Sequence, residues 1–272
     1  MNIEGPKRKK EEEDVEMSEE EEEEEDDGMR LDSVIQEEGV EDIVFDFDDP
    51  QEKHFDSIRG ILFRNTIAKC VNNIALNDLS DLIANDPASA GTVVEVADHE
   101  VICFAAVVNL QHYNSGANTG VDAIRNILSL ATTDNLRAAA SPDSRNNYAF
   151  LARGYLVNVP PKIIATTYRL LRDDLAKMQT FRGFILLVRG EDPTSHHSKS
   201  TPAFKKHATA IAQCDSFDDD CFVAAASEHF SLNPTSSSAA ASISPGGRIS
   251  AIYLDIASFS AAVDEIIQLS EL

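Results

Sequence analysis

Strand-like and helix-like segments alternate along the chain from residue 41 to its end. The apolar run GFILLVRG, residues 183–190, has strand length and predicts an interior strand, because both of its faces would be buried. Residues 162–178 and 258–269 instead repeat apolar side chains at helical spacing. Such alternation favours an α/β fold, in which a single mixed β-sheet is covered by helices.

The same patterns predict the remaining elements. Strands are expected at 43–47, 91–96, 101–110, 150–159 and 249–256, with the second and third forming a hairpin. Helices are expected at 55–69, 77–85 and 120–132, and residues 203–213 are a further helix candidate. Asp49 and Ser258 are the expected N-caps of the first and last helices. Residues 191–247, rich in Ser, Pro, Thr and Gly near both ends, are expected to form a loop-rich insert.

Residues 1–40 differ in composition from the rest and are expected to be a disordered tail. Residues 11–27 are almost entirely acidic, so they have little to bury and repel one another. Ser18 lies before a run of glutamates, the setting that acid-directed kinases prefer. A basic cluster that a nuclear import receptor could read precedes the acidic run: Lys7, Arg8, Lys9 and Lys10. A nuclear protein with one folded domain, residues 41–272, is therefore expected.

The charge of the chain favours a basic protein as partner. The net charge is −24, and residues 1–56, with 25 acidic and 6 basic side chains, account for −19 of it. This charge repels nucleic acid and anionic membranes and attracts basic proteins. No apolar run is long enough for a membrane span or a secretory signal. The acidic residues expected to meet a basic client are Glu22, Glu23, Glu24, Asp46, Asp48 and Asp49.

Asp46 and Asp48 raise the possibility of phosphatase chemistry. Haloacid-dehalogenase enzymes carry a nucleophilic and an acidic aspartate two residues apart after a strand, followed by Gly and Thr. Here Asp49 and Pro50 follow instead, so the loop and the hydroxyl that would hold phosphate are missing. We favour the alternative that Phe45 and Phe47 face the core while the two acids face water.

The rest of that phosphatase pattern is also absent. The apolar strand at 183–190 ends in Arg189 and Gly190 rather than in Ser or Thr. Asp218, Asp219 and Asp220 are expected in an irregular polar segment, not after a strand, so they do not supply the paired acids of a metal site.

No cofactor or metal site is expected. His207, Cys214, Cys221 and His229 are too widely spaced for a typical zinc site. His196 and His197 lie in a polar stretch and are expected to be solvated. The four cysteines have no C-x-x-C pair and are interpreted as reduced thiols. Neither a phosphate-binding P-loop nor a dinucleotide-binding glycine motif occurs.

Several segments, taken in order, resemble the BCCIP family. They are FDFDDPQEKHFDSIRGIL, VVNLQ, GYLVNVPPKIIATTYRLLRDDL, GFILLVRG and ISAIYLDIASFSAAVDEI. The most specific is the turn Asn158 to Pro161 with its helix, since family members carry a similar INVPPQI turn. The likeness covers about residues 40–190 and 248–270, whereas 191–247 matches poorly.

This resemblance implies a fold similar to the GNAT acetyltransferases without their activity. Those enzymes hold acetyl-CoA on a [QR]-x-x-G-x-[GA] loop, and the nearest equivalent here, Gln36 to Glu41, is acidic and precedes the domain. The resemblance further implies a non-enzymatic nuclear protein, with no cofactor, that escorts a basic ribosomal protein of the large subunit. Roles in nuclear export and with cell-cycle regulators follow in the same way. The alternatives are a transferase or phosphatase on a related fold and an acidic histone chaperone.

Overall fold

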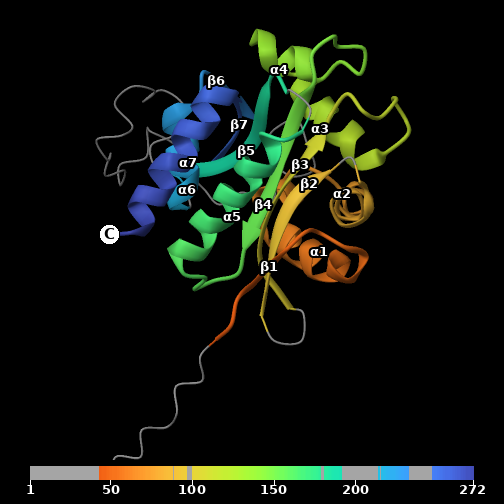
Figure 1. Ribbon diagram of the computed structural model, residues 1–272. Helices are drawn as coiled ribbons and strands as arrows, with labels where there is room; N and C mark the ends of the chain where they lie inside the picture. The colour runs from red at the N-terminus through yellow and green to blue at the C-terminus, as the bar shows by residue number, and fades with distance from the viewer. Residues whose placement is uncertain are drawn as a thin grey trace, which may run out of the picture. The chain divides into compact units, whose positions relative to one another are not determined.

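One mixed sheet organises the folded part of the chain (Figure 1). In this computed structural model the described residues are 43–87, 89–96, 100–178, 181–191, 214, 216–232 and 247–272. The strands among them are β1 (Asp46–Asp48), β2 (Ala90–Val96), β3 (Glu100–Asn109), β4 (Tyr148–Tyr155), β5 (Gly183–Glu191), β6 (Glu228–Leu232) and β7 (Gly247–Asp255). Their order in the sheet is β1-β2-β3-β4-β5-β7-β6, and β4–β5 is the parallel pair among antiparallel ones. The predicted α/β class, with one mixed sheet, is confirmed.

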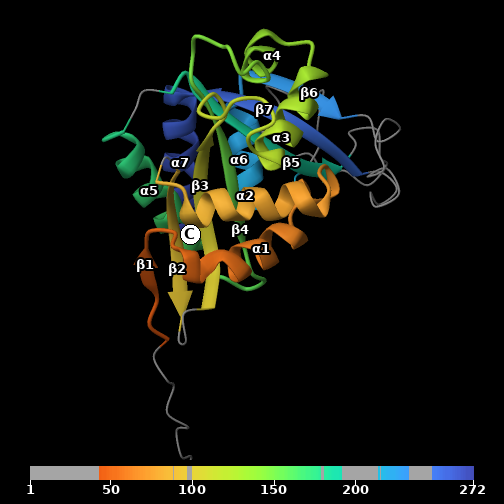
Figure 2. The same ribbon diagram turned by 90° about the vertical axis from the view of Figure 1, so that its right-hand side faces the viewer.

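Helices cover both faces of this sheet (Figures 1 and 2). One face carries α1 (Phe55–Arg64), α2 (Asn73–Asn85), α3 (Thr119–Ser129) and α4 (Asp134–Ala139), with the short 3-10 helices η1 (Glu52–His54) and η2 (Thr66–Lys69) at the ends of α1. The other face carries α5 (Pro161–Leu175), α6 (Phe217–Ala225) and α7 (Ile256–Ser270). None of these described helices combines the length and apolar character needed to cross a membrane.

The strands supply alternate side chains to two cores. In β5, Ile185 and Leu187 pack towards α1 to α4, while Phe184, Leu186 and Val188 pack towards α5 to α7. Successive side chains of a strand point to opposite faces. The continuous apolar run of β5 is thereby explained, and its predicted interior position is confirmed.

Local sequence signals account for several element boundaries. The side chains of Asn72 and Asn118 accept backbone N–H groups at the starts of α2 and α3. Pro161 is the first residue of α5, where its missing N–H costs nothing. Asn158, in the turn before it, has φ of 69°, a left-handed conformation that asparagine tolerates better than most residues. The NVPP motif therefore encodes a specific turn from β4 into α5.

Three sequence predictions about element ends are wrong. The first helix does not run unbroken to Lys69, because Asn65 is extended and η2 follows it as a separate turn. The N-cap of α7 is Asp255, whose carboxylate accepts the N–H of Ser258 at 2.8 Å. At the other end of the domain, Asp49 caps no helix; the turn into η1 has Gln51 at its N-cap position.

The segment 191–247 holds more structure in its described part than its composition suggests. Asp218, Asp219 and Asp220 form the first turn of α6 rather than an irregular stretch, so that prediction is wrong. The helix was missed because a run of three acids hides its apolar residues, which include Cys221 and Phe222. Neither β6 nor α4 was predicted. The helix considered at 203–213 lies outside the described residues.

Candidate functional site

The aspartates of β1 are part of a turn, not of a catalytic pair. Asp48 accepts the backbone N–H of Asp49 at 2.8 Å and the side-chain amide of Gln51 at 2.9 Å, one on each carboxylate oxygen. Asp46 is exposed and pairs in register with Glu95. Both oxygens of Asp48 are therefore engaged in shaping the entry to η1.

Of the two phenylalanines predicted to face the core, Phe45 does so and Phe47 does not. Phe47 is 36% exposed, and Phe45 is half-buried against the core beside α5 and α7. The reason is that β1 is only three residues long and is paired on one side alone, with β2. Burial therefore does not alternate along this edge strand: Phe47 is exposed and Asp48 is half-buried, so the predicted arrangement is wrong at these two residues.

A buried His–Glu pair lies beside this turn and was not predicted. His54 and Glu95 are both buried, and the imidazole contacts the carboxylate through its Nε2 atom. His54 Nδ1 accepts the backbone N–H of Gln51 at 2.9 Å, so the ring proton is on Nε2 and is donated to Glu95. Lys53 Nζ lies 2.9 Å from the same carboxylate. No sequence signal links these residues, because Glu95 is 41 positions from His54.

The ligand atoms of Asp48, His54 and Glu95 lie within 4.8 Å of one another, the arrangement of a possible metal site in the described part of the chain. A metal ion on His54 Nε2 would require the ring proton to move to Nδ1, where it would face the N–H of Gln51. The ammonium group of Lys53 already supplies a cation to both carboxylates. The residues present fit an ion pair that ties η1 to β2 better than they fit a metal.

Asp49 instead lines an acidic cavity of about 460 Å³. The cavity lies where the turn after β1, the end of α2 and the end of α5 come together. Asp86 and Asp174 contribute two further carboxylates to its lining, and Lys177 contributes an ammonium group 2.9 Å from Asp174. The hydroxyl of Tyr113 donates a hydrogen bond to Asp86. We call the cavity lined by these three aspartates the acidic cavity. The sequence analysis had not singled out Asp86 and Asp174.

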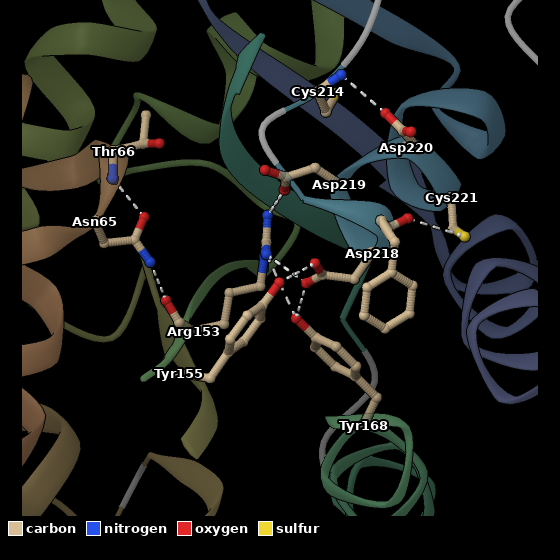
Figure 3. Close-up of polar contacts among 11 residues, drawn as sticks. Asn65, Thr66, Arg153, Tyr155, Tyr168, Cys214, Asp218, Asp219, Asp220 and Cys221 are labelled. Atoms are coloured by element: carbon tan, nitrogen blue, oxygen red, sulfur yellow. Dashed lines mark hydrogen bonds and ion pairs between the residues drawn. The ribbon is translucent and has the colours of Figure 1, made fainter. Parts of the chain in front are cut away.

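A second polar centre, largely buried, joins β4 to α5 and α6 (Figure 3). Arg153 of β4 donates to Asp218 at 2.7 Å and contacts Asp219, and all three side chains are buried. Tyr168 of α5 donates its hydroxyl to Asp218 at 2.7 Å, and Tyr155 does so at 3.0 Å. This network joins β4, α5 and α6.

The electrostatics of the network raise the pKa of its arginine and of its two tyrosines. Burial disfavours the charge of Arg153, but its contacts with Tyr168 and Asp218 outweigh burial and raise the pKa of the guanidinium. Burial raises the pKa of Tyr168 and of Tyr155, and the nearby Asp218 adds to both shifts. Both phenols stay protonated and can donate. The signal in the sequence was the single arginine inside the otherwise apolar strand at residues 148–155.

The cysteines do not have the character of nucleophiles. Burial raises the pKa of Cys103 and of Cys221 to about 12, and that of the half-buried Cys70 to about 12 as well. Cys214 is buried, and its backbone N–H donates to Asp220 at 2.9 Å. The described cysteines are free thiols, as the sequence predicted.

The other residues singled out in the sequence divide into two groups. Three residues considered for zinc lie on separate elements: Cys214 on a bridge beside β5, Cys221 on α6 and His229 on β6. The import cluster, the phosphorylation site, the tail acids and three histidines lie outside the described residues: Lys7, Arg8, Lys9, Lys10, Ser18, Glu22, Glu23, Glu24, His196, His197 and His207.

Comparisons with known proteins agree with the sequence resemblance. The crystal structure of BCP1 from Saccharomyces cerevisiae matches with a TM-score of 0.60 at 17% identity, covering 89% of this chain and 96% of that one. Arabidopsis thaliana NAA60 in complex with acetyl-CoA matches with a TM-score of 0.39 at 9% identity, covering 79% and 99%, which is too low a score to bear on activity. No curated protein matches in sequence.

The family model for BCCIP matches residues 41–225, which is more than half of the chain. The BCP1 structure shares the same fold over nearly its whole length. With the strand order, the NVPP turn and the helices on both faces accounted for, the chain belongs to the BCCIP family.

Proposed function

We propose that this chain is a non-enzymatic nuclear protein that escorts a basic ribosomal protein of the large subunit, supporting ribosome biogenesis and nuclear export. Membership of the BCCIP family gives the class of protein. The observation that carries the proposal is the acidic cavity, where Asp49, Asp86 and Asp174 are gathered from three separate elements. Such a cavity suits the Lys and Arg side chains of a basic client.

The lining of the acidic cavity supports a cationic occupant. Its three carboxylates face one ammonium group, that of Lys177, so the lining carries a net negative charge. Lys177 and Asp174 are substantially exposed, and the pKa of Lys177 is raised by its hydrogen bond to Asp174. Because this pair is solvated, a client cation could displace Lys177 from Asp174 at little cost.

An apolar cavity next to it favours a client segment with both basic and apolar side chains. Met178 lines the acidic cavity and also a second cavity of about 240 Å³. Phe181, Phe184 and Ile256 are among the residues around the second one. An amphipathic basic segment could place cations in the first cavity and an apolar side chain in the second.

The acidic tail would add long-range attraction. Its acidic run, 11–27, would compete with rRNA for the client's basic residues and keep the client soluble. Phosphorylation of Ser18 would add further negative charge. The residues Lys7 to Lys10 would bind an import receptor. Substituting these four residues with alanine and imaging the tagged protein tests this role.

The experiment has two steps. The tagged protein is used to recover its partners from nuclear extract, and its affinity for the recovered partner is then measured. We expect a basic large-subunit ribosomal protein. We also expect about tenfold weaker binding at low salt for the triple variant Asp49→Asn, Asp86→Asn and Asp174→Asn. The matched control changes three exposed aspartates elsewhere and should bind normally: Asp56→Asn, Asp134→Asn and Asp143→Asn. Recovery of no ribosomal protein would sink the proposal, and equal affinities of the two triple variants would remove the cavity from it.

The tail is tested separately. Deletion of residues 11–27 should weaken client binding mainly at low salt, because exposed charge is screened as ionic strength rises. An unchanged affinity at low salt would refute a role for the tail while leaving the acidic cavity untouched.

The alternatives have outcomes in the same experiments. Histones as the main recovered proteins would favour a histone chaperone, and cell-cycle regulators would support the wider family roles. Acetyl-CoA binding by calorimetry, or a phosphatase activity abolished by Asp46→Asn, would favour an enzyme. The engaged oxygens of Asp48 and the protonated thiols are the features that favour a non-enzymatic protein.

A further inference from the structure

The sheet ends at β1, and one side of that strand is open. β1 pairs with β2, and no strand of the described residues lies on its other side (Figure 2). Alternate N–H and C=O groups of an edge strand point away from its neighbour and can pair with another chain. Proteins protect such edges with short strands and charged side chains, and β1 has both features. We call this side of β1 the open edge; its charges determine which kind of strand can pair there.

Apolar side chains accompany the open edge. Phe45 packs at the rim of the core beside α5 and α7, and Phe47, two residues further on, lies on the same face of the sheet but is 36% exposed. Ile43 and Val44, which precede the strand, are 69% and 68% exposed. The two aspartates of β1 lie on the other face. A strand added at the open edge would therefore shield apolar side chains on one face and meet carboxylates on the other.

Asp46 is the acid of the open edge that has no cationic partner among the described residues. It is exposed and lies directly opposite Glu95 of β2, an arrangement in which two like charges destabilise the strand pair. Lys53 instead lies 3.7 Å from Asp48 and 2.9 Å from Glu95. A basic side chain from a partner strand would pair with Asp46 and relieve this repulsion.

The open edge leads into the acidic cavity. After β1 the chain stays close to β2 because Gly91 has no side chain: a Cβ atom there would lie 2.8 Å from Pro50 Cγ. Asp49, Pro50 and Gly91 all line the acidic cavity, together with Asp174 from α5. Three residues of extended chain span about 10 Å. A single extended segment along β1 therefore reaches Asp46 and, a few residues further on, the acidic cavity.

We propose that the open edge accepts an extended segment of the basic client as an additional strand, in which basic and apolar residues alternate. This inference rests on the proposed function for the charge of the client and adds the way in which the client binds. Backbone pairing would give affinity, and the alternation would give specificity. The basic side chains would meet Asp46 on one face, and the apolar ones would meet Phe47 on the other. A further basic residue just beyond the paired stretch would enter the acidic cavity.

A second copy of this chain fits the open edge less well. In an antiparallel pair of two β1 strands centred on Phe47, Asp46 of each chain would lie opposite Asp48 of the other. Like charges directly opposite each other destabilise a strand pair. The acids of β1 therefore oppose self-association while they favour a basic strand.

The test uses a synthetic peptide in which four lysines and three valines alternate, and a control peptide that has the four lysines in a block before the three valines. Fluorescence anisotropy measures binding to the full chain at physiological ionic strength, which screens its exposed acids. We expect the alternating peptide to bind at least tenfold more tightly. The reason is that only this peptide, as a strand, places all its basic side chains on one face. General attraction to an acidic chain would treat both peptides alike.

A pair of variants locates the site. Asp46→Lys should weaken binding of the alternating peptide at least tenfold. Asp143→Lys, which makes the same charge change at an exposed position between α4 and β4, should bind like the unmodified protein. Circular dichroism checks that both variants fold. Hydrogen–deuterium exchange on the unmodified protein needs no variant: the amides of residues 43–49 should exchange more slowly when the alternating peptide is bound.

Three results would overturn the proposal. Equal affinities for the two peptides, or equal losses in the Asp46→Lys and Asp143→Lys proteins, would indicate general electrostatic attraction. Binding without slower exchange at residues 43–49 would place the peptide elsewhere. None of these results bears on the recovery of a ribosomal protein from nuclear extract. Conversely, a preference for the alternating peptide that depends on Asp46, with no ribosomal protein recovered, would contradict the proposed function and support the open edge as a strand-binding site.

Discussion

Arg153 on β4 and Asp218 at the start of α6 are 65 residues apart in the chain, and they share a hydrogen bond of 2.7 Å that is shielded from solvent. The contact joins the part of the sheet that the sequence patterns predicted to a helix that they missed. Since Tyr155 and Tyr168 donate to the same carboxylate, one arginine and one aspartate hold β4, α5 and α6 together.

Replacing Arg153 with methionine should destabilise the domain by about 3–5 kcal/mol, because two buried carboxylates would lose their cation. Urea unfolding followed by circular dichroism measures the change. Arg137→Met, at an exposed arginine, should stay within about 0.5 kcal/mol of the unmodified protein. Adding Asp218→Asn and Asp219→Asn to Arg153→Met should recover part of the loss. No recovery would mean that the lost packing of the side chain, not the charge, dominates.

Two glycines on contacting elements should respond oppositely to alanine. At Gly154 the new methyl group would lie 2.5 Å from Ile61 and 3.1 Å from Asn65, so a loss of about 1–3 kcal/mol is expected. At Gly60, inside α1, a Cβ meets nothing within 4 Å, and alanine should stabilise the domain by about 0.5–1 kcal/mol. Thermal unfolding of the two variants checks the sign, and a stabilised Gly154→Ala would contradict the close approach of α1 to β4.

Glu228 on β6 should stabilise the domain in a pH-dependent way. Its carboxylate accepts the backbone N–H groups of Asn135 and Leu136 at the start of α4. Burial acts to raise the pKa of Glu228, but the donors at this helix start outweigh burial and lower the pKa from 4.5. The ionised form therefore stabilises the folded state above about pH 4.5, and the gain is lost as pH falls through the lower folded pKa.

Measuring the free energy of unfolding of Glu228→Gln between pH 7 and pH 3 tests this pH dependence. The variant should be less stable than the unmodified protein at pH 7, and the two should converge towards pH 3. A difference that stays constant with pH would mean that the carboxylate contributes through packing alone.

The last helix offers a direct comparison of two candidate caps. Asp255→Ala should cost about 1 kcal/mol, because its carboxylate accepts the N–H of Ser258 at the start of α7. Ser258→Ala should cost less, since Ser258 lies within the first turn and its backbone N–H, which alanine keeps, makes that bond. Chemical denaturation of both variants measures the two losses of stability. A larger loss for Ser258→Ala than for Asp255→Ala would support the cap predicted from the sequence.

The three cysteines whose pKa is raised should resist alkylation in the native protein. With a pKa of about 12, Cys70, Cys103 and Cys221 are ionised to about one part in ten thousand at pH 8, and the thiolate is the reactive form. Iodoacetamide followed by mass spectrometry should modify them slowly in buffer and rapidly in urea. Fast native labelling of Cys103 would indicate that the core opens around β3.

Much of the fold was predictable from the sequence because its signals are local. The hairpin of β2 and β3, the interior strand β5 and the helices α2, α3, α5 and α7 follow from apolar spacing read over about ten residues. Such spacing fixes which face of each element is buried, whatever lies against that face. The acidic character of the first 56 residues is likewise a property of composition alone.

The tertiary structure decided the rest, because the deciding contacts join distant residues. Asp49 lines an acidic cavity only because the fold brings Asp86, at the end of α2, and Asp174 of α5 to it. The run of aspartates at 218–220 looks like a loop until Arg153 supplies the buried cation that lets two of them enter a helix in the core. The sequence by itself determined the layers, the apolar faces and the charge of the chain. The cavities were decided by the tertiary structure, because a buried charge is stable only beside its partner.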